Sequence, residues 1–166
     1  PVKKPTLALA FLGVLGAIQG SDPNIASTAL VGAARGLDMG STSLAASIST
    51  LALAATAIST GLLADSLGRR KVLQVALIVS IVGDLIVFLA PDTAFYLLGR
   101  VIAGVGLGAV YGAAFAYIRA AAKPGKLAAA MGLFTAVLMV ATMVLTFAGG
   151  ALSSLEWRTA FLVIPV

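Results

Sequence analysis

The chain has 166 residues, of which 60% are hydrophobic and 10% charged, and its mean hydropathy is +1.09. A soluble domain of this length covers its surface with more charge, so the composition predicts an all-α polytopic membrane protein. The net charge of +5 comes from basic residues beside apolar runs, which favours membrane anchoring over nucleic-acid binding. Because the chain contains no Cys or His, we expect neither an enzyme nor a metal site.

The first apolar run, about 6–31, follows a short basic entry and is predicted to be a retained helix, not a signal peptide. Pro23 interrupts it, because proline has no backbone N–H and leaves the carbonyl of Gln19 without its helical donor. Polar groups at this depth must face protein or a water-filled cavity. Gln19 and Asn24 are therefore candidates for the lining of a substrate cavity.

Two further spans, 43–64 and 72–90, flank a charged loop from Gly61 to Leu73. A fourth span, 94–118, carries Tyr111 as a third candidate for the cavity lining. It also carries small residues at i,i+4 spacing, which allow close helix packing: Gly104, Gly108 and Gly112.

The fifth span is predicted over 127–152, with Gly149 and Gly150 expected to pack against another helix. Residues 160–166 are predicted to begin a sixth helix that the chain cuts short. Helices one to three and four to six then have opposite topologies, as in the inverted repeats of secondary transporters. The chain is thus expected to be one domain, 1–166: the N-terminal six-helix half of a larger bundle.

Basic residues alternate between the two sides of the predicted bundle. Those expected on the cytoplasmic side are Lys3, Lys4, Arg69, Arg70, Lys71, Arg119, Lys123 and Lys126, against Arg35 and Arg158 outside. This imbalance predicts a cytoplasmic N-terminus.

Three ionisable side chains lie within apolar spans, namely Asp22, Asp84 and Arg100. A charge at this depth costs at least about 2.5 kcal/mol, so each needs a partner or water. Asp84 and Arg100 stand eight residues before and after Asp92, which places them at one depth and suggests an ion pair. Alternatively, Arg100 faces the cavity and pairs with substrate or with Asp22. We expect Asp22 to take up and release a proton, or else to be a polar cap at the Pro23 break.

The loop between the second and third spans resembles the signature loop of the major facilitator superfamily. The residues that carry the resemblance are Gly61, Asp65, Gly68, Arg69, Arg70 and Lys71. The resemblance implies that these residues, Asp65 above all, gate the inner side of the transporter; a solvated loop charge is the alternative.

Further matches are similar to proton-coupled drug exporters of that superfamily. They are Asp22, Ala29 and Leu30 in the first helix, Arg100, Gly104 and Gly106 in the fourth, and Gly149, Gly150, Trp157, Arg158 and Phe161 in and after the fifth. The resemblance implies a multidrug antiporter in a bacterial cytoplasmic membrane, with Asp22 and Arg100 in proton coupling.

In the fifth helix, Leu145 and Thr146 occupy the place of the exporters' Gly-Pro. Two alternative functions therefore remain: a transporter of a sugar, acid or amino acid metabolite, and a non-transporting membrane scaffold. The expected partners are a small-molecule substrate, membrane lipid and a C-terminal half of the transporter. The proton gradient, and no cofactor, is the expected energy source.

Overall fold

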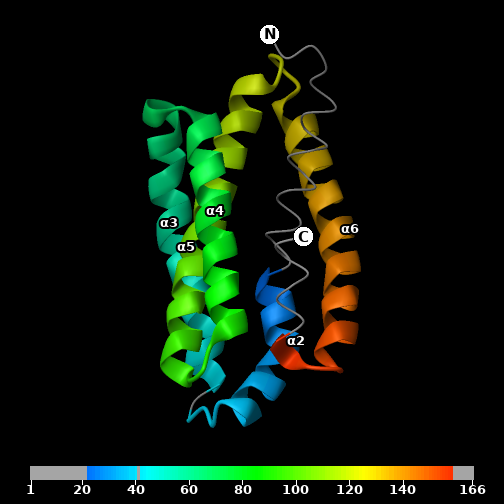
Figure 1. Cartoon of the computed structure of the whole chain (residues 1–166). Coiled ribbons are helices and arrows are strands. Elements are labelled where there is room, and N and C mark those ends of the chain that lie inside the picture. The colour runs from blue at the N-terminus through cyan, green and yellow to red at the C-terminus, as the bar shows by residue number, and fades with distance from the viewer. Residues whose placement is uncertain (1–21, 41, 159–166) are drawn as a thin grey trace.

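The computed structural model describes residues 22–40 and 42–158, without the side chains of residues 61–63, 65, 121 and 153. The described part is helical throughout (Figure 1). Its helices are α2 (Asp22–Gly36), α3 (Thr42–Leu67), α4 (Arg69–Leu89), α5 (Thr93–Ala121) and α6 (Leu127–Ser153). All but α2 contain segments long and apolar enough to cross a membrane, as expected of a multi-pass membrane protein.

The predicted helices are present in these ranges, but most are longer than expected. α2 continues to Gly36, five residues beyond the predicted end of the first span, whereas residues 6–21 lie outside the described part. The predicted start of a sixth helix at 160–166 also lies outside it, so the repeat of three plus three helices stays a prediction.

The predicted charged loop over Gly61–Leu73 is wrong as a loop. α3 continues to Leu67 and α4 begins at Arg69, which leaves Gly68 between them. Gly68 has φ of +92°, a conformation that residues with a Cβ rarely adopt, so this one residue reverses the chain. Directly after the turn, Val72 and Leu73 pack against buried alanines of α3 and α5.

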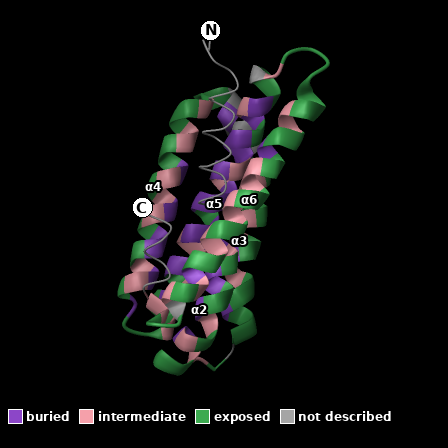
Figure 2. Cartoon of the chain, turned by 90° about the vertical axis from the view of Figure 1, so that its right-hand side faces the viewer, coloured by how far each residue is buried: buried purple, intermediate pink, exposed green. Residues whose placement is uncertain are grey.

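α5 lies between α3 and α4 and forms the centre of the described part. In an apolar 18-residue window of α5, 61% of the residues are buried, against 11% in the corresponding window of α6. Figure 2 shows the buried residues gathered along α5. In Figure 1, α3, α4 and α5 stand together, and α6 stands on the other side of α2.

Glycines bring the backbones of these three helices into contact. A Cβ built on Gly104 or Gly108 would collide with backbone of α3, at Ser49 and Leu53 respectively. On the other interface, a Cβ on Gly83 of α4 would collide with the backbone of Ala103, and one on Gly106 with that of Ser80. Without side chains between them, α3, α5 and α4 form one closely packed unit.

The end of the molecule opposite Gly68 is closed by side chains that follow α6. The Trp157 side chain lies over Gly32 and Gly36 of α2, and its ring meets Tyr96 of α5 edge to face with centroids 6.1 Å apart. Arg158 donates from Nη1 to the carbonyl of Phe88 (2.7 Å) and from Nη2 to that of Ala90 (2.8 Å). These carbonyls end α4, where backbone acceptors lack helical donors, so Arg158 caps that helix.

Candidate functional site: a buried charge cluster

Asp22 is the first residue of α2 and is only 1% exposed. Pro23 follows it, and Gln19, whose carbonyl the missing N–H of Pro23 would leave without a helical donor, lies outside the described residues. The helical face of Asp22 continues with Ile25, Ala26 and Ala29, all of which are buried. The α2 sequence therefore directs this carboxylate into the bundle together with its apolar face.

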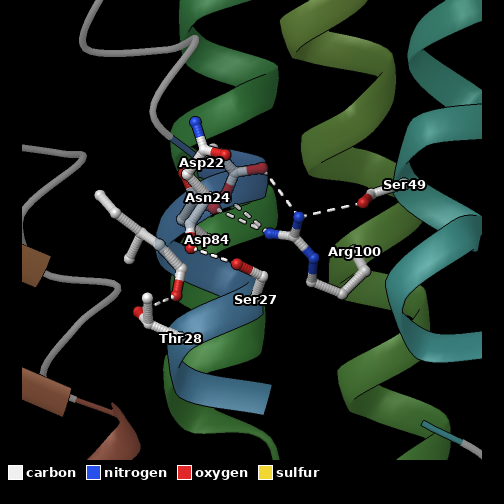
Figure 3. Close-up of polar contacts among 8 residues, drawn as sticks. Asp22, Asn24, Ser27, Thr28, Ser49, Asp84 and Arg100 are labelled. Atoms are coloured by element: carbon white, nitrogen blue, oxygen red, sulfur yellow. Dashed lines mark hydrogen bonds and ion pairs between the residues drawn. The ribbon is translucent and has the colours of Figure 1, made fainter. Parts of the chain in front are cut away.

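Arg100 of α5 holds Asp22 by two parallel hydrogen bonds. Nη1 donates to Oδ1 at 2.6 Å, and Nη2 donates to Oδ2 at 2.8 Å (Figure 3). Nη2 also donates to the hydroxyl of Ser49 on α3 at 3.0 Å. A bidentate carboxylate–guanidinium pair is the strong form of such a contact, and here it joins three helices.

Asp84 of α4 is the third charged group of the cluster. Its Oδ1 lies 4.0 Å from Nη1 of Arg100, and its side chain is fully buried. Neither carboxyl oxygen of Asp84 has a hydrogen-bond partner among the described residues. Arg100 thus binds Asp22 closely and keeps Asp84 as a looser neighbour, where sequence reasoning left both pairings open.

A small cavity of about 130 Å³ opens beside the cluster. Its walls come from α2, α3 and α5 and include both Ser49 and Arg100. The cavity thus brings space for a small polar group up to Ser49 and Arg100, although Arg100 is only 1% exposed.

The predicted cavity residues do not come together in the described part. Asn24 is exposed, and its backbone carbonyl accepts a hydrogen bond from Ser27. Tyr111 lines a different cavity of about 360 Å³, between α3, α5 and α6, where it stacks on Phe115. Tyr111 is eleven residues along α5 from Arg100, or about 16 Å. Gln19 lies outside the described residues.

The predicted gating residues lie at the turn between α3 and α4. A cavity of about 340 Å³ is lined there by Gly68, Arg69 and Arg70, together with Ala64 and Tyr117. The side chains of Gly61 and Asp65 are not among those described, so the role of Asp65 stays a prediction.

The glycines predicted to pack helices differ in their surroundings. Gly104 and Gly108 contact α3, as described above, and Gly112 lies on the wall of the Tyr111 cavity. A Cβ on Gly149 would lie 2.7 Å from Cγ1 of Ile25 on α2. At Gly150 a Cβ would meet no described atom within 4 Å.

Ser49 was not identified from the sequence, although it binds the central guanidinium. α3 carries many Ser and Thr residues, and nothing in its pattern distinguishes Ser49 from the others. Only its depth in the membrane could have indicated it, because a buried hydroxyl at the same depth as Arg100 on a neighbouring helix can accept from an N–H of the guanidinium that has no other acceptor.

Membrane-spanning helices with a charge cluster buried between them are typical of a membrane transport protein. The model of the Major Facilitator Superfamily matches residues 7–166 of this chain. The chain belongs to the major facilitator superfamily.

Several curated transporters are similar to the chain. The glucose transporter GlcP of Staphylococcus epidermidis is 28% identical over 161 residues, covering 93% of this chain and 36% of that protein. The arabinose-proton symporter of Bacillus subtilis is 31% identical over 100 residues, covering 58% of this chain and 22% of the relative. The efflux pump notK of an Aspergillus species is 30% identical over 99 residues, covering 58% of this chain and 18% of notK. The chain thus spans about a third of GlcP and less of the other two.

Proposed function

We propose that this protein is a proton-coupled secondary transporter of a small hydrophilic metabolite, with a sugar as the first candidate. The observation that carries the proposal is the buried, bidentate pair of Asp22 and Arg100. In such a pair between membrane helices, a transported proton can bind the carboxylate and so break the ion pair.

The coupling follows from the electrostatics of the pair. When Asp22 is ionised, its attraction to Arg100 holds α2 against α5. When Asp22 takes a proton, the guanidinium loses its closest partner, and a buried charge without a partner is costly. Protonation therefore changes the relative energy of two helix arrangements, which is the requirement for coupling a proton to alternating access.

The similarity to a glucose transporter and to an arabinose-proton symporter supports the sugar as substrate. Drug export is the second candidate. It is supported by the similarity to notK and by the exporter-like residues around Asp22, Arg100 and Gly149.

Further parts of the proposal concern the protein's setting. A C-terminal half would supply the other wall of the substrate pathway, and the surrounding partner is membrane lipid. The basic residues of the Gly68 turn and of the α5–α6 loop support a cytoplasmic location for this end of the molecule, by the positive-inside rule. The proposed membrane is the cytoplasmic membrane of a bacterium. The proton gradient would be the energy source, without a cofactor.

Transport by the intact protein in liposomes tests this proposal. With an imposed pH gradient, we expect labelled glucose or arabinose to accumulate in wild-type liposomes. Asp22→Asn should reduce accumulation to the equilibrium level. Asp92→Asn is the matched control: it also removes one carboxylate, but Asn caps a helix as well as Asp, and Asp92 caps α5 through Phe95 N–H.

The other outcomes separate the alternatives. Proton-driven movement of a lipophilic cation such as tetraphenylphosphonium, without sugar uptake, would support drug export. Transport of neither probe class would contradict both sugar uptake and drug export, and would leave an acid or amino acid metabolite as substrate, or a membrane scaffold. Sugar accumulation that survives in Asp22→Asn would exclude this aspartate as the coupling group.

A further inference from the structure

We propose that Asp84 is a second proton-carrying group, and that Arg100 pairs with Asp84 whenever Asp22 is protonated. This inference rests on the proposed function and adds a third residue to it. In this structure Asp84 holds a proton, while Asp22 is ionised and bound to Arg100.

Charge balance is the first step. Asp22, Asp84 and Arg100 are each about 1% exposed, so water screens none of them well. With both carboxyl groups ionised, the three residues would carry a net charge of −1 in the membrane interior. Among the described residues, the hydroxyl of Ser49 faces the cluster from α3 and Tyr96 is its other titratable neighbour on α5, and neither supplies a second positive charge. One proton on the cluster makes it neutral, which greatly lowers the cost of burying it.

Geometry then says which carboxyl group holds the proton. Asp22 accepts two charge-assisted hydrogen bonds, which stabilise the ionised form. Asp84 accepts none from the described residues, and its nearest cation lies 4.0 Å away. An ionised carboxylate without donors is the costlier arrangement, so the proton lies on Asp84.

Proximity allows the exchange. To bond Asp84, Nη1 of Arg100 must approach Oδ1 by roughly 1 Å, since such bonds measure about 2.7–2.9 Å. Figure 3 shows the guanidinium with Asp22 and Asp84 beside it.

The proposed step balances in protons and charge. A proton binds a carboxylate oxygen of Asp22, and the two hydrogen bonds from Arg100 to that group break. The guanidinium then bonds Asp84, whose O–H proton passes to water. One proton enters at Asp22 and one leaves at Asp84, while the cluster stays neutral before and after.

Infrared spectroscopy of the intact protein near neutral pH tests the protonation of Asp84 without any substrate. We expect a C=O band of a buried protonated carboxylic acid in wild type that is absent from Asp84→Asn. The same band should disappear in Asp22→Asn, because Asp84 then ionises to pair with Arg100. Asp92→Asn should keep it.

A band that persists in Asp84→Asn would show that the proton lies elsewhere and overturn the proposal. A band lost in Asp84→Asn but kept in Asp22→Asn would overturn the exchange of partners. If the Asp84 variant fails to fold, Asp22→Asn still tests the exchange of partners, because a band that persists in Asp22→Asn overturns it.

Transport then separates this inference from the proposed function. Asp84→Asn should lose sugar accumulation against a gradient but keep counterflow exchange of labelled for unlabelled sugar, because the neutral amide replaces the protonated acid without breaking the Asp22–Arg100 pair. Accumulation lost in Asp22→Asn but retained in Asp84→Asn would contradict this inference alone. Accumulation retained in both would contradict proton coupling at the cluster altogether.

Discussion

The helices α3, α4 and α5 are joined by backbone contacts, whereas α6 is attached through side chains. Gly83, Gly104, Gly106 and Gly108 leave no space for a Cβ between the three helices. α6 reaches α5 through Phe134, which is buried among Ala114 and Ile118, and it reaches α2 where the Ile25 side chain lies against Gly149. The residues that follow α6 add further side-chain contacts. Much of the remaining surface of α6 is apolar and exposed, including Met139 and Phe147.

This contrast separates a rigid unit from a helix whose packing is adjustable. Backbone contacts have no rotamers to change, while a side-chain contact can re-form after a small shift. The charge cluster lies between these two regions: Arg100 and Asp84 belong to the closely packed unit, and Asp22 belongs to α2, which contacts α6. Breaking the Asp22–Arg100 pair would remove the ionic contact between the two regions and leave α2 held to the other three helices by its apolar face, which includes Ile25 and Ala29.

The largest effect is expected from Gly83→Val. Its side chain would collide with the backbone of Ala103, which cannot move without separating α4 from α5. We expect a loss of about 3 kcal/mol in stability, at the high end for overpacking. The apparent midpoint of thermal unfolding in detergent measures it. Gly132→Val on α6 is the control, since a Cβ there meets nothing within 4 Å; equal losses in the two variants would remove the contrast between the two regions.

A smaller effect is expected from Arg158→Lys. Lysine keeps the charge but cannot reach two carbonyls with a planar fork, so at least one of the bonds to Phe88 and Ala90 is lost. One hydrogen bond to a charged group is worth about 1.5 kcal/mol, and the midpoint should fall accordingly. Hydrogen exchange of the amides at the end of α4 localises the change. If exchange there is unaffected, Arg158 does not hold the end of α6 to α4.

The smallest effects distinguish two adjacent glycines. Gly149→Ala places a methyl group 2.7 Å from Cγ1 of Ile25, a buried β-branched side chain that yields only if a helix shifts slightly. We expect a loss of about 1 kcal/mol, at the low end for overpacking. Gly150→Ala meets open space and should stabilise α6 by about 0.5–1 kcal/mol through helix propensity. Opposite signs in thermal unfolding would sharpen the description of α6; a large loss at Gly149 would show that α6 is as rigidly packed as α5.

The helices were predictable because hydropathy alone marks a segment of membrane length. Their ends were not, because the turns are shorter than the charge pattern suggests: Arg69, Arg70 and Lys71 read as a loop but begin α4 after the single residue Gly68. Charged side chains at a membrane surface extend into water from a helix as easily as from a loop, so charge does not mark the end of a helix.

For the site, the sequence identified the three buried charges but not their pairing. Equal depth favoured Asp84 as the partner of Arg100, yet depth does not fix rotation about the helix axis. The rotation of α5 is set by Gly104 and Gly108 against α3 and by Gly106 against α4, and it directs Arg100 toward α2. Ser49 depended on the same rotation and carried no signal of its own.

The capping of α4 by Arg158 also bears on the order of assembly during synthesis. The carbonyl of Phe88 precedes its donor by 70 residues, so α4 and α5 are complete before Arg158 leaves the ribosome. At typical elongation rates the delay is on the order of ten seconds. For that interval the end of α4 depends on water for its hydrogen bonds, and only the arrival of Arg158 closes it. Arg158 therefore caps α4 long after that helix has been synthesised.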